Sequence, residues 1–414
     1  MLVYVGTAHL ALLMGALFAV GSAPEIALSF LHPATLATVH FVTLGWLTAT
    51  ALGAVYALLP MILRTRVDAR WPDVLACIGV LGGASGVIAH MLLATWSGVA
   101  WAGGTIAAGA GWIGLRTVAA LAHAPAPRLP RVAVGLAFVS LVAAAVLGTL
   151  AAIHRASPIF PGGHLRTLAA HAHLALIGWL GLLTVGIGHR LLPMLIPAAP
   201  VEGSRPAWTV ALLALGAVAL PATWLLAPWP SRLPALAAAP LALGMLLFVL
   251  DLLVLARQRK PKAKGLPRRD PALVLIPFAV ACMIGGVGLG FAMLGSEFGP
   301  AWVGLYGVLL LVGGFGGLVL GVGLRLWPLF AWMRGFARTQ QVPGITPGDL
   351  PSYPLQWLVV GAWILAVGGL AAGVLTGSAV VVRLGALAWV VAALAVCVNL
   401  WLVLLRARRA FAAA

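Results

Sequence analysis

The sequence predicts an all-α integral membrane protein with about twelve transmembrane helices in three pseudo-symmetric four-helix arcs. Three observations predict this fold: the composition, the spacing of the apolar runs and an internal repeat. Of the 414 residues, 63% are hydrophobic and only 8% are charged. Soluble domains have roughly 25% charged residues. The composition therefore excludes a soluble enzyme and a disordered chain, and we expect a lipid bilayer as the environment.

Apolar runs long enough to cross the hydrocarbon core as a helix recur along the whole chain. They begin roughly at residues 2, 34, 74, 98, 132, 167, 207, 234, 271, 301, 356 and 380. The first run is not a cleavable signal peptide, because it lacks a basic n-region and a small-residue cleavage site. We expect one transmembrane domain over residues 1–414, in a prokaryotic-type inner membrane.

The formal net charge of +17 would also fit a nucleic-acid partner. The basic residues, however, lie on the connections of one side of the predicted bundle, as the positive-inside rule requires. That side includes Arg66 and the run from Arg257 to Arg269. The exceptions are Arg155, Arg166, Arg232 and Arg383. We therefore expect both termini in the cytoplasm and no nucleic-acid partner.

An internal repeat appears when the second and sixth spans are aligned. The segments are HFVTLGWLTATALGAVYALLPM from His40 and HLALIGWLGLLTVGIGHRLLPM from His173, which lie 133 residues apart, from position 40 to position 173. A weaker third copy, VLLLVGGFGGLVLGVGLRLWPL, begins at Val308. Four spans fit each interval. The predicted repeats cover residues of about 1–130, 131–265 and 266–414.

The ten histidines divide into two groups. We expect His32, His123, His154 and His164, in or beside loops, to be solvated surface groups. The other six lie inside spans, where polar groups are costly and usually functional. By helical rise, His40, His90 and His173 lie roughly 9 Å below the outer surface and His171 about 6 Å below it. His9 lies nearer the membrane centre, and His189 lies near the cytoplasmic end.

A layer of imidazoles without carboxylates or thiolates is typical of haem iron or copper, and not of calcium or magnesium. We predict that His40 and His173 are the axial ligands of a b-type haem. The haem would be held non-covalently, because the chain has no CxxCH motif.

The His171 side chain points about 200° away from that of His173 on a helix. We therefore expect His171, His90 and His9 to form a second site, for copper or a second haem. The alternative, that these histidines only form hydrogen bonds between helices, stays open.

Further residues are expected near the haem. Trp46 and Trp179 are equivalent in the repeat and are expected to line the same cavity. Arg166 and Arg383 are outer-face cations able to pair with haem propionates. Asp251 is the one acidic residue inside a span, and it lies near the cytoplasmic end. A proton relay across the membrane is therefore not expected.

Twelve spans, cytoplasmic termini, three arcs and the second-span motif HFVTLGWLTATALGAVYALLP resemble the catalytic subunit I of haem-copper oxidases and nitric oxide reductases. The resemblance implies that His40 is an axial ligand of a low-spin haem and that Arg383 binds a propionate. A second resemblance is to the NnrS-type haem and copper membrane proteins linked to nitric oxide stress.

The chain departs from the oxidase pattern in its other ligands. The tenth span lacks the family's His-x-His pair and the seventh span lacks its His-His pair, so the usual binuclear oxygen-reducing site is not expected. A His-x-His pattern occurs instead on the sixth span, at His171 and His173.

These features predict a haem-binding membrane protein that resembles oxidase subunit I. We expect it to act in electron transfer, or in handling nitric oxide or another diatomic gas, without proton pumping. As an enzyme it would be an oxidoreductase with a quinol or cytochrome donor. The alternative is a twelve-helix permease with structural histidines, whose parallel repeats would surround a substrate site near the membrane midplane.

Overall fold

The computed structural model describes residues 2–65, 67–125, 127–161, 163–226, 232–260, 270–295, 299–342 and 344–412. These residues form helices and connections, with no β-strand among them. Arg66 and most of the basic run before Asp270, used above to predict the orientation, lie outside the described residues.

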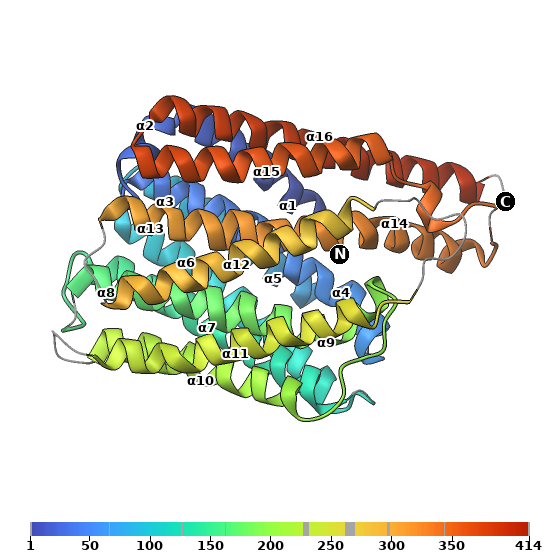
Figure 1. Ribbon diagram of the computed structural model, residues 1–414, viewed down its shortest axis with the longest axis horizontal. Coiled ribbons are helices and arrows are strands. Elements are labelled where there is room, and N and C mark those ends of the chain that lie inside the picture. The colour runs from blue at the N-terminus through green and yellow to red at the C-terminus, as the bar shows by residue number, and fades with distance from the viewer. Residues whose placement is uncertain are drawn as a thin grey trace. The chain divides into compact units, whose positions relative to one another are not determined.

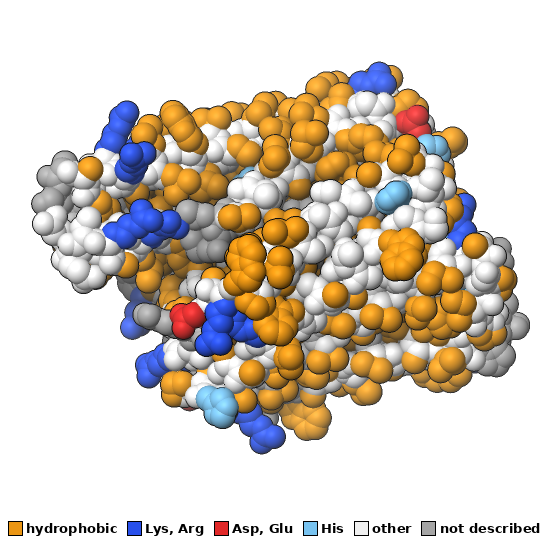
Figure 2. All heavy atoms as spheres, turned by 180° about the vertical axis from the view of Figure 1, so that it is seen from behind, with side chains coloured by type: hydrophobic (Ala, Val, Ile, Leu, Met, Phe, Trp, Pro, Cys, Tyr) orange, Lys and Arg blue, Asp and Glu red, His pale blue; other side chains and the backbone are white. Residues whose placement is uncertain are grey.

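The described residues contain twelve helices that are long and apolar enough to cross a membrane, which confirms the predicted integral membrane protein. Their bounds are Val3–Gly21, Pro33–Leu63, Trp71–Leu92, Trp96–Ala122, Arg128–His154, Gly163–Leu195, Arg205–Leu226, Leu233–Arg257, Ala272–Leu294, Pro300–Thr339, Tyr353–Thr376 and Ala379–Ala412. Large apolar side chains remain exposed in the middle of these helices, among them Leu115, Val139 and Leu365. Such side chains are expected to face lipid. Figure 2 shows one face of the molecule covered largely by hydrophobic side chains, with Lys and Arg in separate patches.

The second, sixth and tenth spans are each built from three consecutive elements. The second comprises α3 (Pro33–His40), the π-helix η1 (Phe41–Thr48) and α4 (Ala49–Leu63). The sixth comprises α8 (Gly163–His173), η2 (Leu174–Gly181) and α9 (Leu182–Leu195). The tenth comprises α13 (Pro300–Gly307), η3 (Val308–Gly316) and α14 (Gly317–Thr339).

The remaining elements are single helices. They are α1 (Leu2–Gly21), α2 (Ala23–Leu28), α5 (Trp71–Leu92), α6 (Trp96–Ala122), α7 (Arg128–His154), α10 (Arg205–Leu226), α11 (Leu233–Arg257), α12 (Ala272–Gly295), the 3₁₀ turn η4 (Pro347–Asp349), α15 (Tyr353–Thr376) and α16 (Ala379–Ala412).

The chain forms two compact units. Unit 1 comprises Met1–Val5, Thr48–Ala263 and Phe291–Ser296. Within it α5 packs on α6, α6 on α7 and α10 on α11, and α7 also contacts η2 and α9. The pair α10 and α11 lies side by side in Figure 1.

Unit 2 comprises Gly6–Leu47, Lys264–Gly290 and Glu297–Ala414. Its most extensive packing is between α15 and α16, drawn in orange and red in Figure 1. A Cβ atom on Gly369 would lie 2.6 Å from the Cα atom of Gly385, so the two backbones approach as closely as small residues permit. The far end of α16 packs with α14 around Ala331, Leu350, Val403 and Ala407.

Each π-helix has one glycine that packs closely against a small residue of a helix preceding it in the sequence. A Cβ atom on Gly45 would lie 2.8 Å from that of Ala11 on α1. A Cβ atom on Gly178 would lie 2.7 Å from that of Ser140 on α7, and one on Gly313 would lie 2.7 Å from Cys282 Sγ on α12. These glycines hold the same register in the aligned sequence segments, and at each contact the neighbouring residue is small enough for two membrane helices to pack closely.

We expect Gly178→Ala to destabilise the protein, because the added methyl group overlaps Ser140 at a tightly packed contact. The expected loss is about 1–3 kcal/mol of the free energy of unfolding, the usual cost of overpacking. The matched control is Gly181→Ala in the same π-helix, where the nearest atom to the new Cβ would be Leu176 O at an ordinary 3.5 Å. Unfolding in mixed detergent micelles measures both variants, and equal stability of the two would contradict this account of the contact.

Candidate functional site

His40 and His173 occupy the same structural position. His40 is the last residue of α3, immediately before η1, and His173 is the last residue of α8, immediately before η2. The two π-helices start at Phe41 and Leu174, so they repeat the offset seen between the histidines. π-Helices are rare and are frequently found at functional sites.

The two imidazoles also make the same hydrogen bond. His40 Nδ1 lies 2.7 Å from the carbonyl oxygen of Leu36, and His173 Nδ1 lies 2.9 Å from that of Ala169. A carbonyl oxygen only accepts, so each Nδ1 carries a hydrogen, and a ring in its neutral form then has its lone pair on Nε2. Metal-ligating histidines usually have this arrangement, with one ring nitrogen donating to a backbone carbonyl and the other binding the metal.

The two histidines belong to different units: His40 to unit 2 and His173 to unit 1. Each is half-buried. Within unit 1, the His173 ring meets the Trp224 ring of α10 edge to face, with the ring centroids 4.5 Å apart. That both histidines bind one iron therefore stays a prediction from the sequence repeat.

His171 contacts a different helix from His173. Its Nδ1 donates to the carbonyl oxygen of Ala144 on α7, at 2.9 Å. A Cβ atom on Gly148 of α7 would lie 2.7 Å from Cε1 of the His171 ring. The histidines of the His-x-His pattern thus lie against α7 and α10, on two sides of their own helix.

The other two residues of the expected second metal site lie apart from this pattern. His90 Nδ1 is 2.7 Å from the Thr95 hydroxyl, in the turn between α5 and α6. His9 is buried in unit 2, and its ring lies edge-on to that of Trp327. Over all the described residues, no three His, Cys, Asp or Glu side chains lie close enough together to hold a metal ion. His171, His90 and His9 therefore form no three-ligand group in that part of the chain.

The expected arginines and tryptophans each have a definite contact. Arg383 is exposed and its Nε donates to Val20 O at 3.3 Å, whereas Arg166 Nη2 donates to Thr223 O at 3.0 Å. Both tryptophans are fully buried. Trp179 Nε1 donates to the Thr48 hydroxyl at 3.1 Å, and the ring of Trp46 meets that of Trp363 with the centroids 5.5 Å apart.

The expectation that His154 is a solvated surface group is wrong. Its side chain is buried, and Nδ1 accepts from the backbone N–H groups of Ile159 and Phe160, at 2.7 and 3.2 Å. The connection after α7 folds back over the helix end, where its N–H groups need acceptors. Proximity to a loop in the sequence does not reveal such a fold-back.

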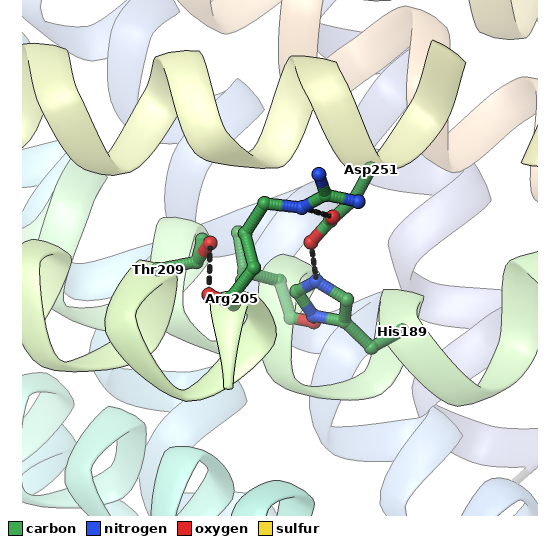
Figure 3. Close-up of polar contacts among 5 residues, drawn as sticks. His189, Arg205, Thr209 and Asp251 are labelled. Carbon is green, nitrogen blue, oxygen red and sulfur yellow. Dashed lines mark hydrogen bonds and ion pairs between the residues drawn. The ribbon is translucent and has the colours of Figure 1, made fainter. Parts of the chain in front are cut away.

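A cluster of three charged or titratable residues joins three helices of unit 1 (Figure 3). His189 Nε2 on α9 lies 2.9 Å from Asp251 Oδ2 on α11, and Arg205 Nε on α10 donates to Asp251 Oδ1. The depth of each residue in its predicted span places His189 and Asp251 at the same end of the membrane but does not show that they are paired. The signal that could have paired them is that an acidic residue inside a span requires a partner.

Two further carboxylates near span ends, those of Asp73 and Asp270, are also paired with arginines. Asp73 accepts from Arg116 and from Trp112 Nε1, and Asp270 accepts from Arg325 Nε at 2.8 Å. These pairs neutralise each carboxylate locally.

No protein-family model matches the sequence, and no curated protein matches it.

We expect Thr48→Val to destabilise unit 1, because it leaves the buried indole N–H of Trp179 without its acceptor. The expected cost is about 1–3 kcal/mol. Thr50→Val is the matched control, since the Thr50 hydroxyl is also buried but has no hydrogen-bond partner among the described residues. Removing it should leave stability unchanged or raise it. Chemical unfolding followed by tryptophan fluorescence compares the variants, and an equal loss in both would show that the indole bond contributes nothing specific.

Proposed function

We propose that the chain is a haem-binding integral membrane protein in which His40 and His173 ligate the iron of a b-type haem. It would act in electron transfer, or in handling nitric oxide or another diatomic gas, as an oxidoreductase supplied by a quinol or cytochrome. The observation that carries the proposal is the shared geometry of the two histidines. Both end an α-helix before a π-helix, and both donate from Nδ1 to the carbonyl four residues earlier.

The donor set fits a haem better than a hard metal ion. Two neutral imidazoles with Nε2 lone pairs are the usual axial ligands of a low-spin haem, whereas calcium and magnesium prefer oxygen ligands. A haem supplies a reversible one-electron change at its iron and a site for a diatomic gas. The chain's own contribution is the Nδ1 hydrogen bond, which fixes the tautomer and makes Nε2 a stronger donor.

The three-arc arrangement belongs to the same proposal and has structural support. Thr48, Gly181 and Gly316 are the last residues of the three π-helices. Trp179 donates to Thr48. The equivalent Trp46 ring would lie 3.1 Å from a Cβ atom on Gly316. Each tryptophan thus meets the end of the π-helix of another repeat, as expected for repeats related by a pseudo-threefold axis.

The absence of proton pumping also remains part of the proposal. A pump needs protonatable groups between the cytoplasmic end and the cofactor layer. Along α9 and η2, the residues between His189 and His173 include one hydroxyl, Thr184, and no carboxylate. A hydroxyl can order water but cannot store a proton at neutral pH. Electron transfer and gas binding do not require such a relay.

The first test is the visible absorption spectrum of the purified protein and its histidine variants. We expect a low-spin bis-histidine spectrum in the wild type, and its loss in His40→Ala and in His173→Ala, because each removes one axial ligand. His123→Ala, at an exposed position in the loop after α6, is the control and should keep the spectrum. A wild-type protein without a Soret band after expression with added haem would favour the permease alternative.

Reconstituted vesicles supplied with a reduced quinol or cytochrome donor test the absence of pumping. We expect no sustained oxygen uptake and no acidification outside the vesicles, because the usual binuclear ligands and a relay to the histidine layer are missing from the sequence. A pH-sensitive dye and an oxygen electrode measure the two quantities together. Oxygen uptake accompanied by acidification would overturn this part of the proposal.

A further inference from the structure

One arginine holds the same register in the second and third repeats but has a carboxylate partner in only one of them. In the aligned segments, Arg325 of the third copy occupies the position of Arg190 in the second. Arg325 Nε on α14 donates to Asp270 Oδ2, just before α12, at 2.8 Å. The ion pairs found among the described residues include Arg325 but not Arg190. The Arg190 side chain is exposed near the end of α9.

The helices packed against α9 and α14 can be compared at the same register. In unit 1, a Cβ atom on Gly186 of α9 would meet that of Ala133 on α7. In unit 2, a Cβ atom on Gly321 of α14 would lie 3.2 Å from that of Leu275 on α12. The two partner positions are 142 residues apart, from 133 to 275, and the contacts of the π-helix glycines give the same interval, from 140 to 282. Residues of α7 and α12 are therefore equivalent at this interval.

By this interval, Arg128 takes the place of Asp270. Asp270 lies five residues before Leu275, and Arg128 lies five residues before Ala133. Because the glycine contacts show that α7 and α9 run in opposite directions, the beginning of α7 at Arg128 lies at the level of Arg190 near the end of α9. Both arginines are exposed, and neither belongs to an ion pair among the described residues. The second repeat thus has two like charges where the third has an ion pair, and an anion between them would offset their repulsion.

A third arginine adds to the positive charge at the beginning of α7. Arg131 lies one turn along the helix from Arg128, and its Nη1 donates to Leu121 O in the last turn of α6, at 3.3 Å. Its Nε is buried and has no hydrogen-bond partner among the described residues. Arginine presents its N–H donors in a planar fork that matches the oxygens of a phosphate group. This group of cations therefore suits a phosphate.

Exposed apolar side chains continue from Arg128 along the same face of α7. Val132, Leu136 and Val139 follow at intervals of four, four and three residues, and all three are exposed. Residues at such intervals lie on one face of a helix. A ligand with a phosphate at one end and a hydrocarbon chain at the other would contact both parts of this face. Phospholipids have this structure, and their headgroups lie just outside the hydrocarbon core, where spans end.

We propose that Arg128 and Arg190 bind the phosphate group of an anionic phospholipid, with an acyl chain along Val132, Leu136 and Val139. The phosphate takes the place that a carboxylate has in the third repeat. A zwitterionic headgroup fits less well, because it brings a cation of its own to the two arginines. The site goes beyond the proposed haem function and does not depend on it, since it contains none of the histidines.

Arg128→Asp is the most informative variant, because it gives the second repeat the ion pair that the third repeat has. The new carboxylate faces Arg190 in the register of the pair between Arg325 and Asp270, so the variant should fold without the lipid. Arg190→Gln removes one cation without adding a carboxylate. Arg257→Asp is the matched control, since it makes the same change of charge at an exposed position at the end of α11 in the same unit.

The experiment is native mass spectrometry of the full chain with phosphatidylglycerol, phosphatidylcholine or inorganic phosphate added. The wild type and Arg257→Asp should bind one phosphatidylglycerol at least about tenfold more tightly than phosphatidylcholine, as expected for the loss or gain of one charge-assisted hydrogen bond. Arg128→Asp and Arg190→Gln should lose this preference.

Three results would overturn the proposal. The first is a wild type without the preference, or Arg128→Asp with the preference unchanged. The second is an equal loss in Arg257→Asp, which would show that the overall charge attracts the lipid. The third is displacement of phosphatidylglycerol by inorganic phosphate at equal concentration, which would show that the ligand is free phosphate and not a lipid.

A second measurement separates loss of binding from loss of folding. A ligand that binds only the folded state raises the temperature of unfolding. The wild type should therefore unfold at a higher temperature in nanodiscs with phosphatidylglycerol than in nanodiscs of phosphatidylcholine alone. Folded Arg128→Asp should unfold at the same temperature in both, and a stabilisation by phosphatidylglycerol that persists in this variant would contradict the site.

Discussion

The hydrocarbon core of a bilayer offers no water to hydrogen-bond polar groups, and the rest of this structure depends on that constraint. It requires helices wherever the chain crosses the membrane, and it requires a partner for every polar side chain inside a span. The described chain meets the first requirement throughout, and the second at its carboxylates inside spans, whereas some buried hydroxyl and indole groups, such as the Thr50 hydroxyl, have no partner among the described residues. Its spans are helical throughout, and Asp73, Asp251 and Asp270 each bond to an arginine. Even the indole N–H of Trp179 has the Thr48 hydroxyl as its acceptor.

The same constraint explains the glycine contacts. Between helices in lipid, close van der Waals packing replaces the hydrophobic effect as a source of stability. Gly45, Gly178 and Gly313 provide that packing at one register of the three π-helices, against Ala11, Ser140 and Cys282. The contacts of Gly45 and Gly178 lie within one helical turn or two of His40 and His173, respectively. Packing of the scaffold and orientation of the histidine rings are therefore coupled through the same segments.

Histidine serves two purposes in this protein because its two ring nitrogens can act differently. In His40, His173 and His189, Nδ1 donates to a carbonyl one turn earlier. The group opposite Nε2 then determines the chemistry. A carboxylate, as at His189, makes the ring part of a polar cluster that joins neighbouring helices. For His40 and His173, we propose that the group opposite Nε2 is a haem iron, which a neutral ring can bind.

The number and positions of the twelve spans followed from the sequence alone, because membrane thickness sets helix length and hydropathy marks each run. The depth of each residue in the membrane, counted along its predicted span, also placed His40 and His173 at the same depth, and His189 and Asp251 at the same end of the bundle. The sequence could not show that His189 pairs with Asp251, because that contact joins residues far apart in the chain. It could not show that His154 is buried either, because the connection that covers His154 folds back over the end of its helix. The sequence could not predict the π-helices either. Each of them packs closely on a neighbouring helix at Gly45, Gly178 or Gly313, and such packing is a property of the tertiary structure. Composition and periodicity determined the membrane fold and the lengths of its helices. The direction of each polar side chain was decided only by tertiary packing. The reason is that a hydrogen bond depends on distances to within a few tenths of an ångström, which spacing in the sequence does not encode.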